Sequence, residues 1–551
     1  MPMRLSFITL SLAIAAGLHA PAAQAQDART APMGGDIIES RIDSGFLHAT
    51  ARDAGTVVFQ THVHEPGAAW IRLRFEDVQL PGVHGSGTES VLRLTSMLDG
   101  AVQELDAIEL MQWQNSSAYF NGDTVLIEVV NRGTAGVHNF RMSEFVAGPD
   151  AGVPAEVQRS ICFGIDDREL SDDPRVARIA PIGCTGWMID DCNNCFLTAG
   201  HCTGSGSQVV QFNVPLSNPN GSWNNPHPDD QYAIDQSSMQ SNGGQGIGND
   251  WAYFGAFPNS NTGLRPAEAQ GDYFELISPP AVTGQPIRVT GYGTVSSPVP
   301  GTWNSVQKTH VGPFAINSGN RIGYTTDTTG GNSGSPVILD STGQAIGIHT
   351  HAGCGSSGGA NNGTSSRHPS LQDALANPLG VCCGGEPEPP APFDLLYPAD
   401  EAEAVERNPV MSWQAADNTW YYKIWVADNP ELQDAVVDGF QTANTQISLP
   451  PNYLDEGTTY YWQVEAMASN GLTRLGTPQL ATFTTVGSLV PCLGDTDGNG
   501  SIDLADLNAV LATFGATGGG EGSLEGDVDG NGSVDLADLN IVLAAFGTTC
   551  P

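Results

Sequence analysis

The stretch Thr328-Thr329-Gly330-Gly331-Asn332-Ser333-Gly334-Ser335-Pro336 surrounds one serine with glycines and runs directly into the apolar segment 337–339. Glycine lets the backbone adopt positive φ and bring its N–H groups close to a bound group. A nucleophilic serine requires such donors, because negative charge develops on the oxygen of the group that it attacks. The stretch therefore predicts Ser333 as a nucleophile, with the backbone N–H groups of Gly331 and Ser333 as its oxyanion hole.

A histidine and an aspartate upstream complete a candidate catalytic triad. His201 ends the string Phe196-Leu197-Thr198-Ala199-Gly200-His201, and its imidazole titrates near neutral pH, as a general base must. Asp250 opens an apolar segment between the histidine and the serine, and a carboxylate is needed there to hold the imidazole in one tautomer. Three other aspartates lie in a polar stretch rich in Asn and Pro and are expected to be solvated: Asp229, Asp230 and Asp235.

The order His201, Asp250, Ser333 resembles that of the trypsin/chymotrypsin superfamily, most closely the bacterial glutamyl endopeptidases. The strings that carry the resemblance are Cys184-Thr185-Gly186-Trp187-Met188-Ile189, Thr198-Ala199-Gly200-His201-Cys202, the nucleophile stretch 328–336 and Gly347-Ile348-His349. The resemblance implies a serine endopeptidase that acts on proteins or peptides and needs no cofactor for catalysis. It also implies two β-barrels with the triad between them, and a disulfide between Cys184 and Cys202.

Two other functions remain open at this stage. One is an adhesive or scaffold protein whose protease-like domain is inactive. The other is an esterase with the same triad, which the chain order and the flanking strings disfavour.

The residue preference depends on three positions of the expected specificity pocket: Asp327, Thr328 and His349. If Asp327 points into the pocket, its charge favours Arg or Lys before the scissile bond. In glutamyl endopeptidases a histidine and a threonine that match His349 and Thr328 hold an acidic side chain instead. A buried aspartate beside a bound glutamate would cost several kcal/mol, so this specificity requires Asp327 to turn away. We favour cleavage after Glu because of the Gly-Ile-His string, and we expect His351 to line the substrate site or the surface.

The composition indicates an exported, acidic protein. The chain has 21 Lys and Arg against 60 Asp and Glu, a formal net charge of −39, which disfavours nucleic acid or an anionic membrane as a partner. Residues Met1–Ala25 have a positive start, an apolar run and a small-x-small cleavage site, which predicts a signal peptide and secretion. No other segment has the roughly 18 uninterrupted apolar residues of a membrane span.

Composition and strand patterns predict a mainly β fold, with β-sandwich domains and a small α-helical calcium-loop module. The resemblance implies that the domain between them is a double β-barrel trypsin-like protease. The expected boundaries are a signal peptide (1–25), an N-terminal β-sandwich (26–159), the protease (160–383), a Pro-rich linker (384–392), a fibronectin type III-like domain (393–486) and dockerin-like repeats (492–551). The alternation at 70–75 predicts a half-buried strand.

The junction at 158–168 resembles the mature start of glutamyl endopeptidases and predicts cleavage after Arg159. The sandwich before it is either a propeptide or a retained substrate-binding domain.

The last segment contains a repeat with a period of 32 residues, since Asp527 corresponds to Asp495. Oxygen ligands at loop positions 1, 3, 5, 7, 9 and 12, with glycine at 6, are the pattern of calcium loops. The predicted ligands of structural Ca²⁺ are Asp495, Asp497, Asn499, Ser501, Asp503, Asp506, Asp527, Asp529, Asn531, Ser533, Asp535 and Asp538. The loops and the single helix after each (507–514 and 539–546) resemble dockerin modules, which implies a cohesin-like or cell-surface partner. The alternative is a calcium-stabilised cap.

Ten cysteines in an exported chain are expected to be mostly paired. The spacing of Cys192 and Cys195 suggests a local bridge, with a redox pair or a zinc site as alternatives. The remaining pairs are expected within two groups: Cys162, Cys354, Cys382 and Cys383 in the protease, and Cys492 with Cys550 in the last module.

Overall fold

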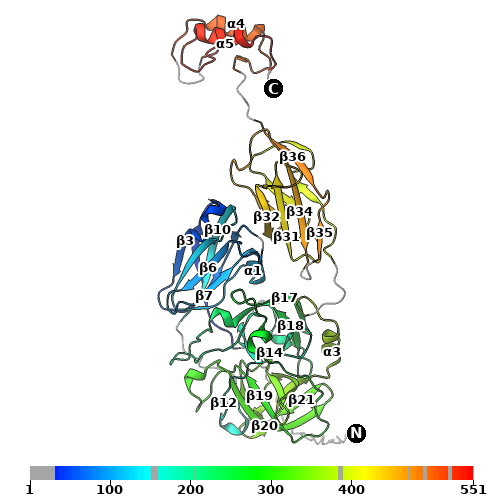
Figure 1. The fold of residues 1–551 in the computed structure, drawn as a ribbon. Coiled ribbons are helices and arrows are strands. Elements are labelled where there is room, and N and C mark those ends of the chain that lie inside the picture. Colours follow the sequence, from blue (N-terminus) through cyan, green and yellow to red (C-terminus); the bar gives the residue numbers. More distant parts are fainter. Residues whose placement is uncertain are drawn as a thin grey trace, which may run out of the picture.

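The computed structural model describes residues 31–82, 84–149, 159–204, 207–382, 389–468, 472–487, 493–518 and 524–549. The predicted signal peptide and the cysteines at 383, 492 and 550 lie outside these residues. In Figure 1 two green barrels lie at the bottom, a blue sandwich and a yellow sandwich lie above them, and two red helices lie at the top. The mainly β fold with two barrels and additional sandwich sheets confirms the predicted fold class.

The N-terminal sandwich consists of two antiparallel sheets that share one core. One sheet has the order β1-β10-β4-β8, with β2 and β5 also paired to β10: β1 (Asp36–Asp43), β10 (Gly136–Pro149), β4 (Ala68–Arg74), β8 (Phe120–Asn121), β2 (Leu47–Ala49) and β5 (Asp77–Gln79). The other has the order β3-β9-β6-β7: β3 (Thr56–His64), β9 (Thr124–Asn131), β6 (Val91–Ser96) and β7 (Val102–Leu105). Helix α1 (Ala107–Gln112) follows β7.

The prediction of a half-buried strand at 70–75 is wrong for β4. Trp70, Ile71, Arg72 and Leu73 are all at most 5% exposed. Successive residues of a strand point to opposite faces, so both faces of this strand are covered. The second face lies against the neighbouring barrel, where Arg72 donates a hydrogen bond to Gln208.

Six strands form the first barrel in the closed order β13-β14-β15-β18-β17-β16. They are β13 (Val176–Pro181), β14 (Cys184–Met188), β15 (Phe196–Thr198), β18 (Ala252–Ala256), β17 (Gln231–Ser241) and β16 (Ser207–Gln211). Stacked rings of Phe196 and Phe254, 5.3 Å apart, lie in its core.

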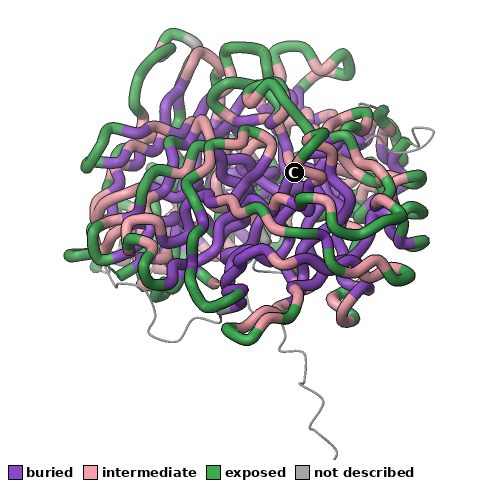
Figure 2. Tube along the Cα trace, turned by 90° about the horizontal axis from the view of Figure 1, so that it is seen from below, coloured by how far each residue is buried: buried purple, intermediate pink, exposed green. Residues whose placement is uncertain are grey.

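The second barrel has the order β20-β19-β23-β24-β27-β21, and the pairing of β20 with β21 closes it. Its strands are β20 (Lys308–Ser318), β19 (Pro286–Gly291), β23 (Pro336–Leu339), β24 (Gln344–His351), β27 (Asn361–Ser365) and β21 (Arg321–Tyr324). The smaller elements between residues 159 and 382 are β11 (Arg159–Ser160), β12 (Glu169–Leu170), β22 (Thr328–Thr329), β25 (Cys354–Gly355), β26 (Gly358–Gly359), α2 (Pro266–Gln270) and α3 (Pro369–Ala376). Figure 2 views the molecule from below and shows buried segments inside a rim of exposed loops.

The C-terminal sandwich packs a three-stranded sheet, β28-β30-β33, on a sheet of order β29-β36-β34-β31-β32 with β35 beside β34. Their bounds are β28 (Leu395–Tyr397), β30 (Val410–Trp413), β33 (Gln446–Ser448), β29 (Ala402–Val405), β36 (Ala481–Thr485), β34 (Thr459–Met467), β31 (Tyr421–Ala427), β32 (Val437–Thr442) and β35 (Thr473–Leu475). Trp413 and Trp462 are buried in its core.

Two helices, α4 (Leu504–Thr513) and α5 (Leu536–Ala545), form the last module around a small apolar core. Each begins one turn before the predicted start because an aspartate, Asp503 or Asp535, caps its first N–H groups. Among the described residues, no helix is both long and apolar enough to cross a membrane.

Three disulfides link described residues: Cys162–Cys354, Cys184–Cys202 and Cys195–Cys382. The pair Cys184–Cys202 confirms the bridge that the resemblance implied. The predicted local bridge between Cys192 and Cys195 is wrong, because Cys195 pairs across the fold with Cys382 beyond helix α3. Gly255 leaves space for this bond, since a Cβ there would lie 2.9 Å from one sulfur and 3.1 Å from the other.

Candidate active site

His201 and Asp250 meet because two neighbouring strands of the first barrel place them at the same edge. Strand β15 pairs antiparallel with β18, with Thr198 opposite Ala252. His201 lies three residues after the first of these positions, and Asp250 lies two residues before the second. The pairing therefore brings together residues that are 49 positions apart in the chain.

Two hydrogen bonds join the histidine to the aspartate. Nδ1 of His201 lies 2.7 Å from Oδ2 of Asp250, and the backbone N–H of His201 donates to Oδ1 at 3.1 Å. The carboxylate is 1% exposed, while the imidazole is 21% exposed. Since a carboxylate accepts hydrogen bonds, we assign the proton of this pair to Nδ1, which leaves the lone pair on Nε2. Nε2 is buried and has no hydrogen-bond partner in the described part of the chain.

The prediction that Asp235 is solvated is wrong. It lies in β17, is 4% exposed, and accepts hydrogen bonds from the backbone N–H groups of Ser237 and Val381 at 2.9 Å each. Its carboxylate is therefore engaged in fixing the chain near Cys382, away from His201.

The loop that carries Ser333 is anchored on the first barrel by strand β14. The N–H of Thr185 donates to the carbonyl of Ser333 at 2.8 Å, and Thr185 Oγ1 donates to the carbonyl of Gly331 at 2.9 Å. Trp187 Nε1 donates to the carbonyl of Gly334 at 2.9 Å. These bonds fix a loop of the second barrel against the strand that precedes His201, so they place the serine between the two barrels.

The backbone around Ser333 requires glycine at two positions. Gly331 has φ 98° and Gly334 has φ 90°. A Cβ would lie 2.6 Å from the carbonyl oxygen of Tyr292 at the first position, and 2.1 Å from that of Thr185 at the second. Among the described residues, no acceptor pairs with the N–H of Gly331 or Ser333. Both donors are therefore free to bind an oxyanion.

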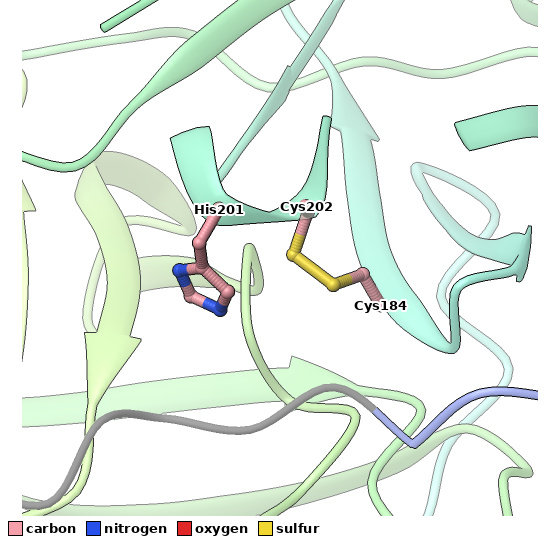
Figure 3. A group of neighbouring side chains, drawn as sticks. All are labelled: Cys184, His201 and Cys202. Carbon is pink, nitrogen blue, oxygen red and sulfur yellow. A yellow bond between two sulfur atoms is a disulfide. The ribbon is translucent and has the colours of Figure 1, made fainter. Parts of the chain in front are cut away.

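The Cys184–Cys202 disulfide braces the turn that presents His201, as Figure 3 shows. The ligand atoms of these three residues lie within 4.8 Å of one another. Zinc binds thiolates, but both sulfurs are joined to each other here. The group is a structural brace beside the imidazole.

Asp327 points away from the expected pocket and toward the start of the protease region. Its Oδ1 accepts the backbone N–H of Cys162 at 2.7 Å, and Oδ2 accepts that of Asp167 at 3.4 Å. Its own N–H donates to Nδ1 of His310 at 2.6 Å, and Nε2 of His310 lies 3.1 Å from Asp167. Burial raises the pKa of the Asp327 carboxyl, and these hydrogen bonds oppose the rise.

His349 and Thr328, the two residues expected to bind an acidic substrate side chain, lie next to the loop that carries Ser333. His349 is 2% exposed, its Nδ1 lies 2.8 Å from the hydroxyl of Tyr324, and its carbonyl accepts the N–H of Gly334 at 2.8 Å. Burial, with the nearby imidazoles of His351 and His201, lowers the pKa of His349 to about 3. Its imidazole is therefore neutral at physiological pH. Thr328 Oγ1 accepts a hydrogen bond from Asn361 at 3.0 Å, which leaves its own hydrogen free to donate.

His351 is buried close to His201 and Asp250, so of the two predicted positions the surface one is wrong. It is 5% exposed, its ring centroid lies 6.3 Å from that of His201, and its Nδ1 lies 3.9 Å from Oδ2 of Asp250. Among the described residues, His349 and His351 do not belong to any group of three or more metal-ligand side chains.

Two features that hold the region around the serine loop were not predicted from the sequence. Arg168 forms a buried two-bond ion pair with Asp166, at 2.6 and 2.8 Å, and also donates to Thr329 Oγ1 at 2.9 Å and to Asn332 Oδ1 at 3.3 Å. Asn361 joins the same region through Ser160, whose carbonyl accepts its amide at 3.1 Å. The Asp-x-Arg spacing was a visible signal for the first. Nothing in the sequence marked the asparagine.

The predicted calcium ligands come together in part. The carboxylates of Asp495, Asp497 and Asp506 have oxygens within 4.8 Å of one another, and so do those of Asp527, Asp529 and Asp538. Asp503 and Asp535 instead cap the helices, accepting N–H groups at 2.7 Å. Clustered carboxylates repel one another, and a hard cation with oxygen ligands relieves that repulsion. The donor set therefore fits Ca²⁺.

The comparisons with known proteins match part of the chain. Residues 184–348 match the family model described as a trypsin-like peptidase domain. No curated protein matches the chain. Among solved structures, a Glu endopeptidase in complex with MPD is 21% identical (TM-score 0.29; 40% of this chain and 96% of that chain covered). A thermostable serine protease from an extremophilic microorganism is 17% identical (0.27; 35% and 92%). Neuropsin, a serine protease expressed in the limbic system of mouse brain, is 16% identical (0.29; 39% and 100%).

At identities of 16–21% and TM-scores of 0.27–0.29, these three structures assign neither an activity nor a substrate to this chain. The family match covers the segment that contains His201, Asp250 and Ser333. Residues 184–348 of this chain thus match a trypsin-like peptidase domain.

Proposed function

We propose that the protein is a secreted serine endopeptidase with His201, Asp250 and Ser333 as its triad. The observation that carries the proposal is the 2.7 Å contact of His201 with a buried Asp250, beside a serine loop with two unpaired N–H donors. A buried carboxylate on Nδ1 leaves the lone pair on Nε2, the atom that must take the proton of a serine hydroxyl. Among the described residues, no hydrogen bond joins Nε2 of His201 to Oγ of Ser333.

The proposed reaction assigns each of these residues a role. Ser333 Oγ attacks the scissile carbonyl while Nε2 of His201 takes its proton, and Asp250 stabilises the imidazolium. The N–H groups of Gly331 and Ser333 bind the oxyanion. The imidazolium then gives its proton to the leaving amine as the peptide bond breaks. Water, deprotonated by the same imidazole, releases the acyl group from the serine and restores the hydroxyl.

For the residue before the scissile bond we propose Glu. The carboxylate of Asp327 is occupied by the backbone of residues 162–167, so it does not offer a negative charge to a basic substrate. His349 is neutral and buried, and with Nδ1 accepting from Tyr324 its Nε2–H would donate to the substrate carboxylate. Thr328 supplies a second donor. Cleavage after Arg or Lys is the alternative.

The remaining modules extend this proposal. The predicted signal peptide at 1–25 would direct secretion. Attachment to the cell surface is the alternative location. The domains would have the boundaries predicted from the sequence. The two loops of the last module would hold structural Ca²⁺ through the carboxylates that cluster there. A bound ion would supply positive charge among those carboxylates. The dockerin-like pattern favours a cohesin-like partner.

A library of quenched peptides that vary before the scissile bond tests the proposal. We expect turnover after Glu, absent in Ser333→Ala. In His349→Gln or Thr328→Val, kcat/KM for Glu peptides should fall about 10- to 100-fold, the value of a hydrogen bond to a charged group. Peptides with Ala at this position should be affected much less. Turnover after Arg or Lys instead of Glu would contradict the proposed binding of the substrate side chain by His349 and Thr328. No turnover by any peptide would leave the inactive scaffold as the function.

A further inference from the structure

The N-terminal sandwich lies against the first barrel through a contact built like a protein core. The apolar cluster of the sandwich continues into the barrel without interruption. The barrel residues that belong to it are Ala180, Val209, Trp223, Ala233 and Phe257, all at most 8% exposed. Contacts that resemble a domain core cut in half are typical of permanent interfaces.

A buried glutamine binds both backbone groups of one residue of the sandwich. Gln231 in β17 is fully buried; its Oε1 accepts the N–H of Tyr119 at 3.0 Å, and its Nε2 donates to the carbonyl of Tyr119 at 2.9 Å. Tyr119 precedes β8. One side-chain amide thus replaces a neighbouring strand for this residue, because it satisfies both backbone groups.

Two asparagines make the same kind of contact on either side of it. Asn121 of the sandwich donates to the carbonyl of Asn225 at 3.0 Å and accepts its N–H at 2.9 Å. Asn261 of the barrel region accepts the N–H of Glu104 at 2.9 Å and donates to the carbonyl of Val102 at 2.7 Å. Two of these three side-chain amides belong to the barrel region and one belongs to the sandwich. Each domain therefore supplies hydrogen-bonding groups to the backbone of the other.

The chain before the sandwich also adds to the barrel. Ala31 N–H donates to the carbonyl of Gly183 at 3.1 Å, and Met33 N–H donates to that of Pro181 at 2.7 Å. Gly183 has φ 68°, and a Cβ there would lie 1.8 Å from the carbonyl oxygen of Ala31. A side chain at position 183 would therefore exclude this segment. Gly183 directly precedes Cys184, which forms a disulfide.

We propose that the sandwich is a permanent subunit of the working protein and stays bound when the chain is cut at the predicted site after Arg159. Departure of the sandwich would expose the shared apolar cluster on both sides and leave the amide clamps to water. The part of the barrel that it covers includes the start of β17, where Ile234 pairs with Ala256 of β18, the strand that follows Asp250. The sandwich therefore supports the barrel that positions His201 and Asp250. This inference goes beyond the proposed function and needs no peptidase activity.

A cut in the inactive full-length chain tests the proposal. The chain has no cysteine before Cys162, so no disulfide can tether the N-terminal fragment. Ser333→Ala protein with the recognition sequence of a site-specific protease in place of residues 152–157 is folded, purified and cut. We expect both fragments to elute together in size-exclusion chromatography at micromolar concentration. Separate elution of the N-terminal fragment would overturn the proposal.

Variants of the asparagine clamps show whether these contacts hold the fragments together. Asn121→Ala and Asn261→Ala each remove two hydrogen bonds across the contact and should each raise the dissociation constant of the cut protein about tenfold. Asn317→Ala is the matched control, since it removes two side-chain hydrogen bonds, to Pro280 and from Arg367, within the second barrel. It should leave the dissociation constant unchanged. Equal dissociation constants for the parent and both clamp variants would contradict the assigned contact.

Discussion

Oδ1 of Asp327 accepts the backbone N–H of Cys162 at 2.7 Å, although the two residues are 165 positions apart. Cys162 is also joined to Cys354 by a disulfide. The residue that could have been the negative base of a specificity pocket is thus the acceptor that fixes the start of the protease region.

Substitution of this carboxylate should therefore change stability more than specificity. We expect Asp327→Asn to keep the preference before the scissile bond within about twofold and to lower the melting temperature, because weakened buried hydrogen bonds cost about 1–3 kcal/mol. Peptide-library profiles and calorimetry measure the two effects. A large change in the Arg-to-Glu ratio would place the carboxylate in the pocket.

Arg168 should act as a positioning residue for the serine loop. Arg168→Lys loses the two-bond fork and its contacts with Thr329 and Asn332. We expect kcat to fall about 10-fold with little change in KM, since a loop bond of about 1–2 kcal/mol is lost. Arg175→Lys is the control, because Arg175 binds Asp173 with the same two-residue spacing at 2.8 Å and lies outside that loop. Equal effects of both substitutions would indicate a merely structural role.

The members of the triad should differ in their contributions. By analogy with other serine proteases, Ser333→Ala should lower kcat about 10⁶-fold and Asp250→Asn about 10⁴-fold, since the amide favours the wrong tautomer of His201. Active-site titration with a serine-directed inhibitor checks the intact fraction. Full activity of Asp250→Asn would exclude this carboxylate from the triad.

The pH dependence of stability should include a contribution from His349. Its pKa is about 3 in the folded protein and about 6.5 in an unfolded chain. Between these values the unfolded chain binds the additional proton, so the free energy of unfolding falls as the pH drops from 6.5 toward 3, by at most about 1.4 kcal/mol per pH unit. Above 6.5 the contribution is constant.

Calorimetry of Ser333→Ala protein at pH 4.5 and 7.5, with and without His349→Gln, measures this contribution. The second substitution should reduce the loss of stability at pH 4.5. His138, whose pKa burial lowers to about 4, retains its own contribution in both proteins. An identical pH dependence with and without the His349 substitution would contradict the prediction.

Removal of calcium should affect only the last module. We expect a chelator to lower the melting temperature of one calorimetric transition and to leave peptidase turnover unchanged. Asp497→Asn with Asp529→Asn should abolish the heat of Ca²⁺ binding in titration calorimetry, because one clustered carboxylate is lost from each loop. Binding heat that persists in this variant would exclude these loops as the site.

Local sequence signals accounted for much of the fold and of the candidate site. The glycines around Ser333 are needed where backbone groups approach within 2.6 Å of a missing Cβ, and such a requirement is visible in the string itself. Alternating strands and the 32-residue repeat are also local patterns. The sequence motifs identified His201, Asp250 and Ser333 as candidates. The 2.7 Å contact between the first two depends on the pairing of β15 with β18.

The sequence by itself indicated the strand-rich fold and the candidate catalytic residues, and its resemblance to trypsin-like peptidases implied the two barrels and the Cys184–Cys202 pair. Only the tertiary structure decided where Asp327 points, that Cys195 pairs with Cys382, that Asp235 is buried and that both faces of β4 are covered. Each of these depends on groups that approach from distant parts of the chain, such as the amide of Cys162 or the surface of the first barrel. Periodicity and spacing describe how a segment folds locally, whereas the direction of a buried side chain is set by the partner that replaces water around it.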